Sequence, residues 1–329
     1  MISERYLSIG TRGSKLALWQ AEFVAARLRE VLPSMPVVIT PITTSGDRNL
    51  SITLPELGGK GAFTDELEAA LRRGDIDLAV HSLKDMPTLM PAEFVIGAVP
   101  QRASPYDALI SRQRQKLHEL PLGAKIGTGS LRRSAQLKAL RPDVEILPLR
   151  GNVPTRLEKL LAADSPYDAI VLAVAGLDRL GLTGHITEIM TPDVMLPAPG
   201  QGALAVQCRA DDTALRRVLT RIDDLVTRIE VEAERALLTV LDAGCHLPVA
   251  ALARFNHRSA TLALTGRVLS VSGTTSITVH SEIDLIDSDV TAHNEVLFQH
   301  ILATARHLGE ALAEQAIRRG AGDLLRVGE

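Results

Sequence analysis

Arginine and hydroxyl side chains gather at three places where an apolar, strand-like run gives way to a helical pattern. These places are residues 9–15, 127–133 and 149–156, and each combines a glycine turn with at least one arginine. The first N–H groups of a helix have no partner within the helix, so a helix start beside guanidinium groups forms an anion site. Three such junctions indicate a ligand with several negative groups. The side chains concerned are Arg12, Ser14, Thr128, Ser130, Arg132, Arg133, Arg150 and Arg156.

A lysine and a carboxylate stand side by side in a loop that follows another short apolar strand. The segment 80–87 ends at a proline and contains Ser82, Lys84 and Asp85. If the basic junctions lie near this loop, their charges keep Asp85 ionised, and its carboxylate could stabilise a developing cation or transfer a proton. A turn aspartate that caps local backbone is equally consistent with the sequence. His81 is interpreted as a buried structural residue.

The chain has two cysteines, in different settings. Cys208 lies in an apolar, strand-like run, so we interpret it as a core residue. Cys245 lies in a loop between Gly244 and Pro248, where a thiol can be accessible and partly ionised. A buried small apolar residue is the alternative for Cys245. Two cysteines are too few for a disulfide framework or a cysteine-rich zinc module, and we expect no metal site.

The composition is that of a globular protein and excludes several classes of partner. The 329 residues suggest about two domains, or three small ones, at roughly 150 residues per domain. A net charge of -3 and 3% aromatic residues argue against a nucleic-acid coat or a base-stacking surface. Residues 125–159 nevertheless carry eight basic and three acidic side chains, a local charge of +5. Arginine outnumbers lysine by 29 to 7, which codon bias could also produce.

No segment has the pattern of a membrane anchor or a nucleotide-binding loop. The longest apolar run, residues 169–177, is too short to cross a bilayer, and the first residues lack the apolar core of a signal peptide. We therefore expect a cytoplasmic protein without a membrane partner. The glycine-rich stretch at 57–61 lacks the spacing of a P-loop, and no dinucleotide fingerprint follows a strand.

The first two thirds of the chain alternate strand-like and helix-like patterns, twice over. This alternation with short loops predicts α/β units with parallel sheets and crossover helices. Strands are expected at 6–11, 37–43, 76–81, 94–99, 125–128, 144–147 and 168–174, and helices at 14–32, 64–73, 130–140 and 153–163.

The last third has a different pattern, in which helices and strands are grouped. Such grouping is typical of an α+β domain, so we place a boundary at residues 220–225. The Pro- and Gly-rich loop and strand at 196–209 are expected to return to the first sheet. A hairpin turn is expected at Ser272 and Gly273. The expected helices are 212–221, 224–241 and 290–319, and the expected strands are 249–255, 261–271 and 276–283.

Seven segments, in order and at matching spacing, resemble the porphobilinogen deaminase family, whose members are also called hydroxymethylbilane synthases. No single segment is specific, but the ordered set is, and the resemblance covers residues 5 to 320 approximately. The segments are TRGS at 11–14 with LALWQ at 16–20, GKG at 59–61 with Phe63, AVHSLKDMP at 79–87, GTGSLRR at 127–133, LRGNV at 149–153, LAVAGL at 172–177 and LPAPGQG at 196–202.

The resemblance implies a three-domain fold that agrees with the element pattern. The fold class is α/β, with two lobes like those of type II periplasmic binding proteins, joined by two crossing segments, and a small C-terminal α+β domain. We expect lobe 1 to comprise residues 1–100 and 200–220, and lobe 2 residues 101–199. Residues 221–329 form the C-terminal domain, which carries the cofactor-anchoring cysteine.

The resemblance also implies a reaction, a substrate and a cofactor. The family joins four porphobilinogen molecules head to tail, with loss of ammonia each time, to give hydroxymethylbilane, a precursor of haem-type tetrapyrroles. By resemblance, Asp85 is the catalytic carboxylate, which stabilises a cationic azafulvene and moves protons, and Cys245 holds a dipyrromethane cofactor through a thioether. Substrate and cofactor are expected to lie against Arg12, Ser14, Lys60, Phe63, Ser82, Lys84, Thr128, Ser130, Arg132, Arg133, Arg150, Arg156 and Gln201.

The competing hypothesis is a non-catalytic anion-binding protein on the same two-lobed scaffold. Such a protein would need an export signal but neither Asp85 nor Cys245, and the sequence shows the reverse pattern. Four residues depart from the family pattern, namely Glu56, Asp65, Ala243 and His246. We expect a monomer.

Overall fold

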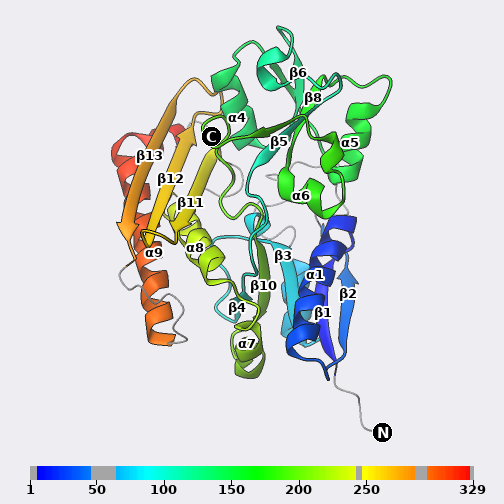
Figure 1. Cartoon of the computed structure of the whole chain (residues 1–329), viewed down its shortest axis with the longest axis vertical. Coiled ribbons are helices and arrows are strands. Elements are labelled where there is room, and N and C mark those ends of the chain that lie inside the picture. Colours follow the sequence, from blue (N-terminus) through cyan, green and yellow to red (C-terminus); the bar gives the residue numbers. More distant parts are fainter. Residues whose placement is uncertain (1–5, 46–63, 242–246, 286–294, 327–329) are drawn as a thin grey trace.

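Three β-sheets, each with its own helices, make up the structure, a computed structural model that describes residues 6–45, 64–241, 247–285 and 295–326. Lys60, Phe63 and Cys245 fall outside these residues. Figure 1 shows two α/β lobes, one above the other, with the third sheet beside them. Within the described ranges, no helix has the length and apolar character needed to span a membrane.

The lower lobe of Figure 1 contains a five-stranded sheet in the order β2-β1-β3-β10-β4. Ser14 caps the first helix, because its hydroxyl accepts a hydrogen bond from the Ala17 N–H. The core packs Ile9, Leu28 and Val206 together. The elements are β1 (Leu7–Arg12), β2 (Val37–Ile42), β3 (Leu78–Ser82), β4 (Phe94–Ala98), β10 (Leu204–Arg209), α1 (Lys15–Val31), α3 (Asp65–Arg73) and α7 (Thr213–Leu219).

The upper lobe contains a second five-stranded sheet, in the order β7-β6-β8-β5-β9. Asn152 caps α5 by accepting a hydrogen bond from the Thr155 N–H. Leu109, Ile126 and Val171 contribute to its core. The elements are β5 (Asp107–Ser111), β6 (Lys125–Gly127), β7 (Glu145–Leu147), β8 (Ala169–Ala173), β9 (Glu188–Met190), α4 (Leu131–Leu140), α5 (Val153–Leu161) and α6 (Val174–Arg179).

The two sheets share one topology. In each sheet, a strand that follows one of the two crossing segments is inserted next to the edge strand, between β3 and β4 in the lower sheet and between β8 and β9 in the upper sheet. That strand is β10 in the lower sheet and β5 in the upper sheet, and both are antiparallel to their neighbours. The prediction of parallel sheets is therefore wrong at β10, which returns to the first sheet but runs antiparallel in it, and no strand was expected at 107–111, where β5 lies. Both strands arrive from the other lobe along segments 99–106 and 191–203 rather than through a crossover helix. The predicted return of residues 196–209 to the first sheet is confirmed.

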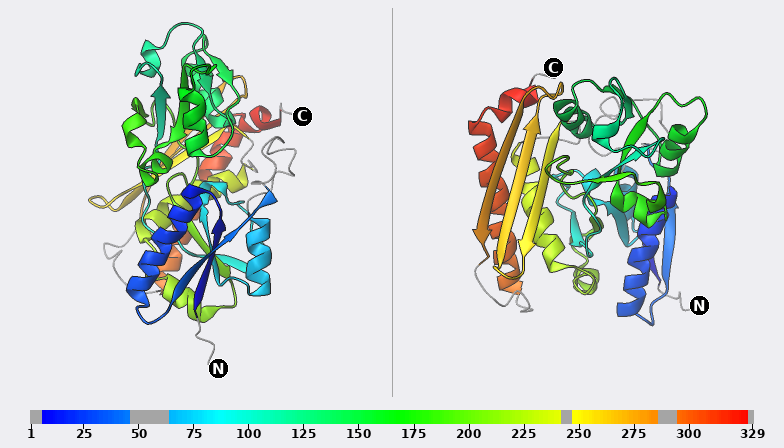
Figure 2. Two further views of the ribbon diagram at one scale, coloured as in Figure 1. Left: turned by 90° about the vertical axis from the view of Figure 1, so that its right-hand side faces the viewer. Right: turned by 45° about the horizontal axis from the view of Figure 1, so that its top comes forward.

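The C-terminal part is a three-stranded antiparallel sheet covered on one face by α8 and α9, as Figures 1 and 2 show. The predicted hairpin is confirmed. Its Gly273 has a φ of +77°, and a Cβ there would lie 2.4 Å from the Ala135 carbonyl oxygen on α4, so this turn needs glycine. The α/β class with a small third domain is confirmed. The elements are α8 (Leu225–Val240), β11 (Val249–Asn256), β12 (Thr261–Leu269), β13 (Ser276–Asp284), α9 (Glu295–Arg318) and α10 (Ala321–Arg326).

A buried ion pair joins both crossing segments to α8. Arg102 donates to both carboxylate oxygens of Glu234, at 2.8 and 3.0 Å, and through Nε to the Gln201 carbonyl oxygen at 2.9 Å. Glu234 is fully buried and also accepts from the N–H groups of Gly200 and Ala253, at 2.6 and 2.9 Å. The two crossing segments are thereby fixed to the C-terminal sheet.

Replacing the buried carboxylate should destabilise the whole chain. In Glu234→Gln the buried Arg102 loses the carboxylate that binds both of its Nη atoms and keeps only the longer contact with Glu230 Oε2, at 3.4 Å. The free energy of unfolding should therefore fall by about 3–5 kcal/mol. Glu314→Gln is the matched control, because its ion pair with Arg318 is exposed and should contribute less than about 1 kcal/mol. Urea denaturation measures the free energy of unfolding of both variants. Equal decreases in the two variants would contradict the claim that the buried pair contributes more than the exposed one.

Candidate active site

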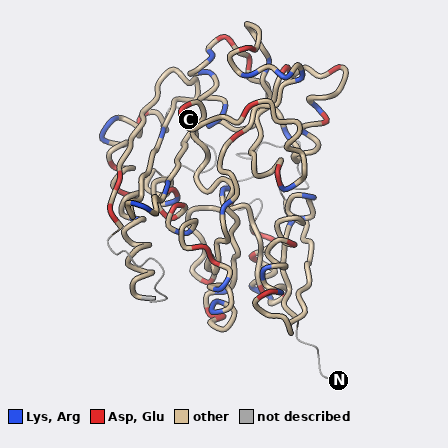
Figure 3. Tube along the Cα trace, viewed as in Figure 1, with Lys and Arg blue, Asp and Glu red and all other residues tan. Residues whose placement is uncertain are grey.

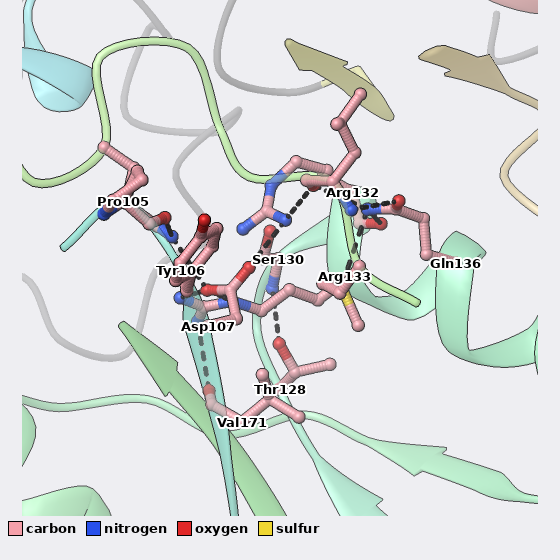
Figure 4. Close-up of polar contacts among 12 residues, drawn as sticks. Pro105, Tyr106, Asp107, Thr128, Ser130, Arg132, Arg133, Gln136 and Val171 are labelled. Atoms are coloured by element: carbon pink, nitrogen blue, oxygen red, sulfur yellow. Dashed lines mark hydrogen bonds and ion pairs between the residues drawn. The ribbon is translucent and has the colours of Figure 1, made fainter. Parts of the chain in front are cut away.

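A fully buried carboxylate organises two of the predicted anion-binding arginines (Figure 4). Asp107, the first residue of β5, accepts from Arg132 Nη1 at 2.8 Å through Oδ2. Its Oδ1 accepts from Arg133 Nε and Nη2 at 3.0 and 2.7 Å. Burial favours the neutral acid, but the charges of Arg132 and Arg133 outweigh it and hold the pKa of Asp107 below its ordinary value. Asp107 is therefore a carboxylate at neutral pH.

The two arginines differ in how many of their N–H groups already have a hydrogen-bond acceptor. Arg133 also donates from Nη1 to the Val171 carbonyl oxygen at 3.0 Å, so each of its nitrogens is bonded. Arg132 Nη1 bonds the Leu196 carbonyl oxygen at 2.8 Å as well as Asp107, but Arg132 Nε is buried without a hydrogen-bond partner among the described residues. An unpaired buried donor of this kind fits a site that receives a further acceptor group.

Gln201 connects this cluster to the lower lobe. Its Nε2 donates to the Pro105 carbonyl oxygen at 2.6 Å and to Asp107 Oδ1 at 3.0 Å, and its Oε1 accepts from Lys84 Nζ at 3.2 Å. Burial lowers the pKa of Lys84 to about 8, against the attraction of neighbouring Asp85. Below that pH, three cations surround one buried carboxylate, and the excess positive charge suits a polyanionic ligand.

Asp85 lies where the lobes face each other. It ends the short 3-10 turn Leu83–Asp85 directly after β3, and its side chain is exposed. No hydrogen bond or ion pair ties its carboxylate to another described residue. Burial and the charge of Arg133 lower the pKa of Arg156 to about 10, while Asp85 raises it. The charge of Asp85 therefore acts on Arg156, in the upper lobe, as well as on Lys84 beside it.

The predicted hydroxyl residues are engaged in local hydrogen bonds. Besides the cap at Ser14, Ser82 Oγ accepts from Gln20 Nε2 at 2.8 Å. Thr128 Oγ1 accepts from the Ser130 N–H at 3.1 Å, which shapes the turn into α4. These bonds leave the hydroxyl hydrogens of Ser82 and Thr128 for another acceptor.

The remaining predicted cations lie at the carboxyl ends of strands or at helix starts. Arg12 ends β1, and Arg150 precedes the helix α5, which contains Arg156. Arg156 Nε donates to the Gly151 carbonyl oxygen at 2.6 Å. Figure 3 shows acidic and basic residues spread over all three parts of the molecule. The net charge of -3 is a sum over all of them, so it does not reveal the cations that gather at this site.

Two interpretations of individual residues are confirmed. His81 is buried, its Nε2 lies 3.0 Å from Gln207 Oε1, and burial lowers its pKa to about 4, so it is neutral at physiological pH. Cys208 is fully buried in the lower core, and burial raises the pKa of its thiol to about 11. Neither residue is suited to react at neutral pH.

Sequence reasoning missed Arg179, which joins the two lobes at the end of α6. Its Nη2 donates to the Gly202 carbonyl oxygen at 2.7 Å, and its guanidinium lies over the Trp19 ring of α1, 5.7 Å from the centroid. Burial lowers its pKa to about 10. Its position in the sequence could have indicated this role. Like the predicted arginines, Arg179 follows a strand of the upper sheet, β8, although it lies at the end of the helix α6 rather than at its start.

Comparisons with known proteins bear on both lobes and on the C-terminal part. The family model described as "Porphobilinogen deaminase, dipyromethane cofactor binding domain" matches residues 7–217, and "Porphobilinogen deaminase, C-terminal domain" matches residues 228–317. The chain belongs to the porphobilinogen deaminase family. The predicted family is thus confirmed, and the anion-binding alternative is not favoured.

Relatives named porphobilinogen deaminase align with most of the chain. The protein from Desulforudis audaxviator is 46% identical over 321 residues, which cover 98% of this chain and 97% of that protein. The protein from Xanthomonas euvesicatoria is 52% identical over 266 residues, 81% of this chain and 86% of that protein. Among solved structures, the effector binding domain of a BenM variant has a TM-score of 0.40 at 12% identity, covering 67% of this chain and 93% of that chain. A score this low carries no conclusion.

The pKa of Lys84 predicts a pH effect on substrate binding. Since its pKa is lowered to about 8, the ammonium loses its proton as the pH rises from about 7 to about 9, and KM for porphobilinogen should rise several-fold. In Lys84→Arg the guanidinium stays charged, so the rise should be smaller, whereas Lys116→Arg, at an exposed position, should behave like the wild type. Steady-state kinetics measure this, and parallel profiles for all three proteins would contradict it.

Proposed function

We propose that this chain is a transferase that condenses four porphobilinogen molecules head to tail into hydroxymethylbilane, with loss of ammonia at each step. One observation carries the proposal. An exposed carboxylate, Asp85, follows β3 among the cations Lys84 and Arg156, from opposite lobes. Family membership supplies the substrate class.

The cations match the charge of the substrate. Each porphobilinogen carries an acetate and a propionate, so a growing chain of pyrroles is a polyanion. We propose that the Lys84–Gln201–Asp107 cluster and its two arginines hold these carboxylates, since guanidinium groups bind carboxylates in two-pronged geometry. We propose the same binding role for the other predicted residues, Arg12, Ser14, Lys60, Phe63, Ser82, Thr128, Ser130, Arg150 and Arg156.

Asp85 would act on the charge that develops in the substrate. When the C–N bond of the substrate's aminomethyl group breaks, ammonia leaves and the pyrrole becomes a cationic azafulvene. A carboxylate that accepts a hydrogen bond from the pyrrole N–H lowers the energy of that cation. After the new C–C bond forms, the attacked α-carbon must lose its proton, and Asp85 is placed to take it. Its exposure leaves the carboxylate accessible to substrate.

Cys245 is the proposed anchor for the dipyrromethane cofactor. The cofactor supplies, when bound, the terminal pyrrole α-carbon with which the first condensation takes place. Of the two cysteines, Cys208 is fully buried in the core with a raised thiol pKa, which leaves Cys245 for a thioether bond. Arg132 Nε, buried without a partner among the described residues, fits a carboxylate of such a group.

The three sheets support the predicted division into domains. We propose that lobe 1 comprises residues 1–100 and 200–220, lobe 2 residues 101–199 and the C-terminal domain residues 221–329, because each sheet then lies in one domain. With the crossing segments as hinge, the lobes can adjust as the pyrrole chain lengthens. We propose that the protein acts as a monomer.

The cofactor proposal predicts the mass of the purified protein. Intact mass spectrometry should show an excess equal to two pyrrole units in the wild type and in Cys208→Ser, because only the loop thiol is expected to react. Cys245→Ser should have the mass of its sequence alone and no activity. An unmodified wild type that consumes porphobilinogen would rule out the tether.

The catalytic proposal predicts the effect of neutralising Asp85. Asp85→Asn should lower kcat by roughly 10²- to 10⁴-fold, the usual contribution of a positioned acid–base group, with an unchanged melting temperature because the side chain is exposed. Asp164→Asn, another exposed position, is the control and should retain wild-type kcat. Ammonia release from porphobilinogen is the measurement. Wild-type release by Asp85→Asn would remove this residue from the catalytic role.

A further inference from the structure

We propose that Asp107 is a positioning residue, which sets the orientation of Arg132 so that its remaining donors meet the carboxylates of the bound pyrroles. This inference rests on the proposed function. Asp107 is fully buried, so it cannot itself contact substrate. Its effect must pass through the side chains that it holds.

Both carboxylate oxygens of Asp107 are engaged in hydrogen bonds. Oδ1 accepts three hydrogen bonds, from Arg133 Nε, Arg133 Nη2 and Gln201 Nε2, and Oδ2 accepts one from Arg132 Nη1, all at 3.0 Å or less. Four donors from α4 and a crossing segment therefore converge on one carboxylate. Three of these bonds come from arginines, whose long side chains lose rotamer freedom when they are fixed in one orientation.

The charge balance gives Asp107 a second effect. Arg132 and Arg133 are consecutive residues with only 5% exposure each, and two buried guanidiniums repel each other. Asp107 neutralises one of the two charges, so the trio is left with one net positive charge. That single excess charge can attract an anion without destabilising the folded lobe.

The same carboxylate orients Gln201 and hence Lys84. With Gln201 Nε2 held by Asp107 and by the Pro105 carbonyl, Gln201 Oε1 must point to Lys84 Nζ, 3.2 Å away. Lys84 neighbours Asp85, the proposed catalytic residue. Asp107 therefore couples the arginines of the upper lobe to the catalytic loop of the lower lobe.

Two substitutions separate charge from position. Asp107→Asn keeps the size of the side chain but removes the charge and turns one acceptor into a donor facing the arginines. Asp107→Glu keeps the charge but moves the carboxylate by one methylene. Asp143→Asn is the matched control, because Asp143 binds Arg141 just after the other end of α4, with Nε and Nη2 both at 2.7 Å, at the surface.

The measurements are intact mass, melting temperature, kcat and KM for porphobilinogen. We expect Asp143→Asn to match the wild type in mass, kcat and KM. Asp107→Glu should fold and carry the cofactor, with KM raised roughly tenfold or more and kcat changed much less, because binding rather than chemistry is impaired. Asp107→Asn should show a larger rise in KM and incomplete cofactor loading.

Each other outcome has a distinct meaning. Wild-type KM in Asp107→Glu would overturn the positioning role, whether or not Asp107→Asn folds, because it would show that the place of the carboxylate is immaterial. If kcat and kcat/KM of Asp107→Glu fell equally while KM stayed unchanged, the positioning role would also be overturned. A wild type that does not consume porphobilinogen would instead overturn the proposed function, and this inference with it.

Discussion

The buried carboxylate of Asp107 is the constraint on which the rest of the site depends. It allows two consecutive arginines to lie in the interior at the start of α4, where a guanidinium pair alone would repel itself. Through Gln201 it also fixes Lys84 on the other lobe. The site thus carries an excess of positive charge without leaving two buried guanidiniums unopposed, which suits the polyanionic ligand that we propose.

The topology explains how such distant residues meet. Each lobe inserts one strand of the crossing chain into the middle of its sheet, so Asp107 and Gln201 lie at the ends of the two crossing segments rather than at a remote edge. The Arg102–Glu234 pair then binds these segments to α8 of the C-terminal sheet.

Much of this could be predicted from the sequence, for local reasons. The cap at Ser14, the hairpin at Gly273 and the anion-binding junction before Arg132 depend on short-range chemistry that neighbouring residues reveal. The strand β5 was missed, and the antiparallel course of β10 could not be predicted, because a short apolar run does not encode its direction. Asp107 and Arg179 were also missed, since their partners lie 23 or more residues away along the chain and only the folded sheets bring them together.

A crystal structure of the purified protein with its bound pyrroles would test the central claim most directly. The account predicts electron density continuous with Cys245 Sγ, with pyrrole carboxylates within hydrogen-bond distance of Arg132 and Lys84 and a pyrrole N–H donating to the Asp85 carboxylate. Asp107 should remain bonded to both arginines. Pyrroles bound elsewhere, or carboxylates that contact none of these cations, would contradict it.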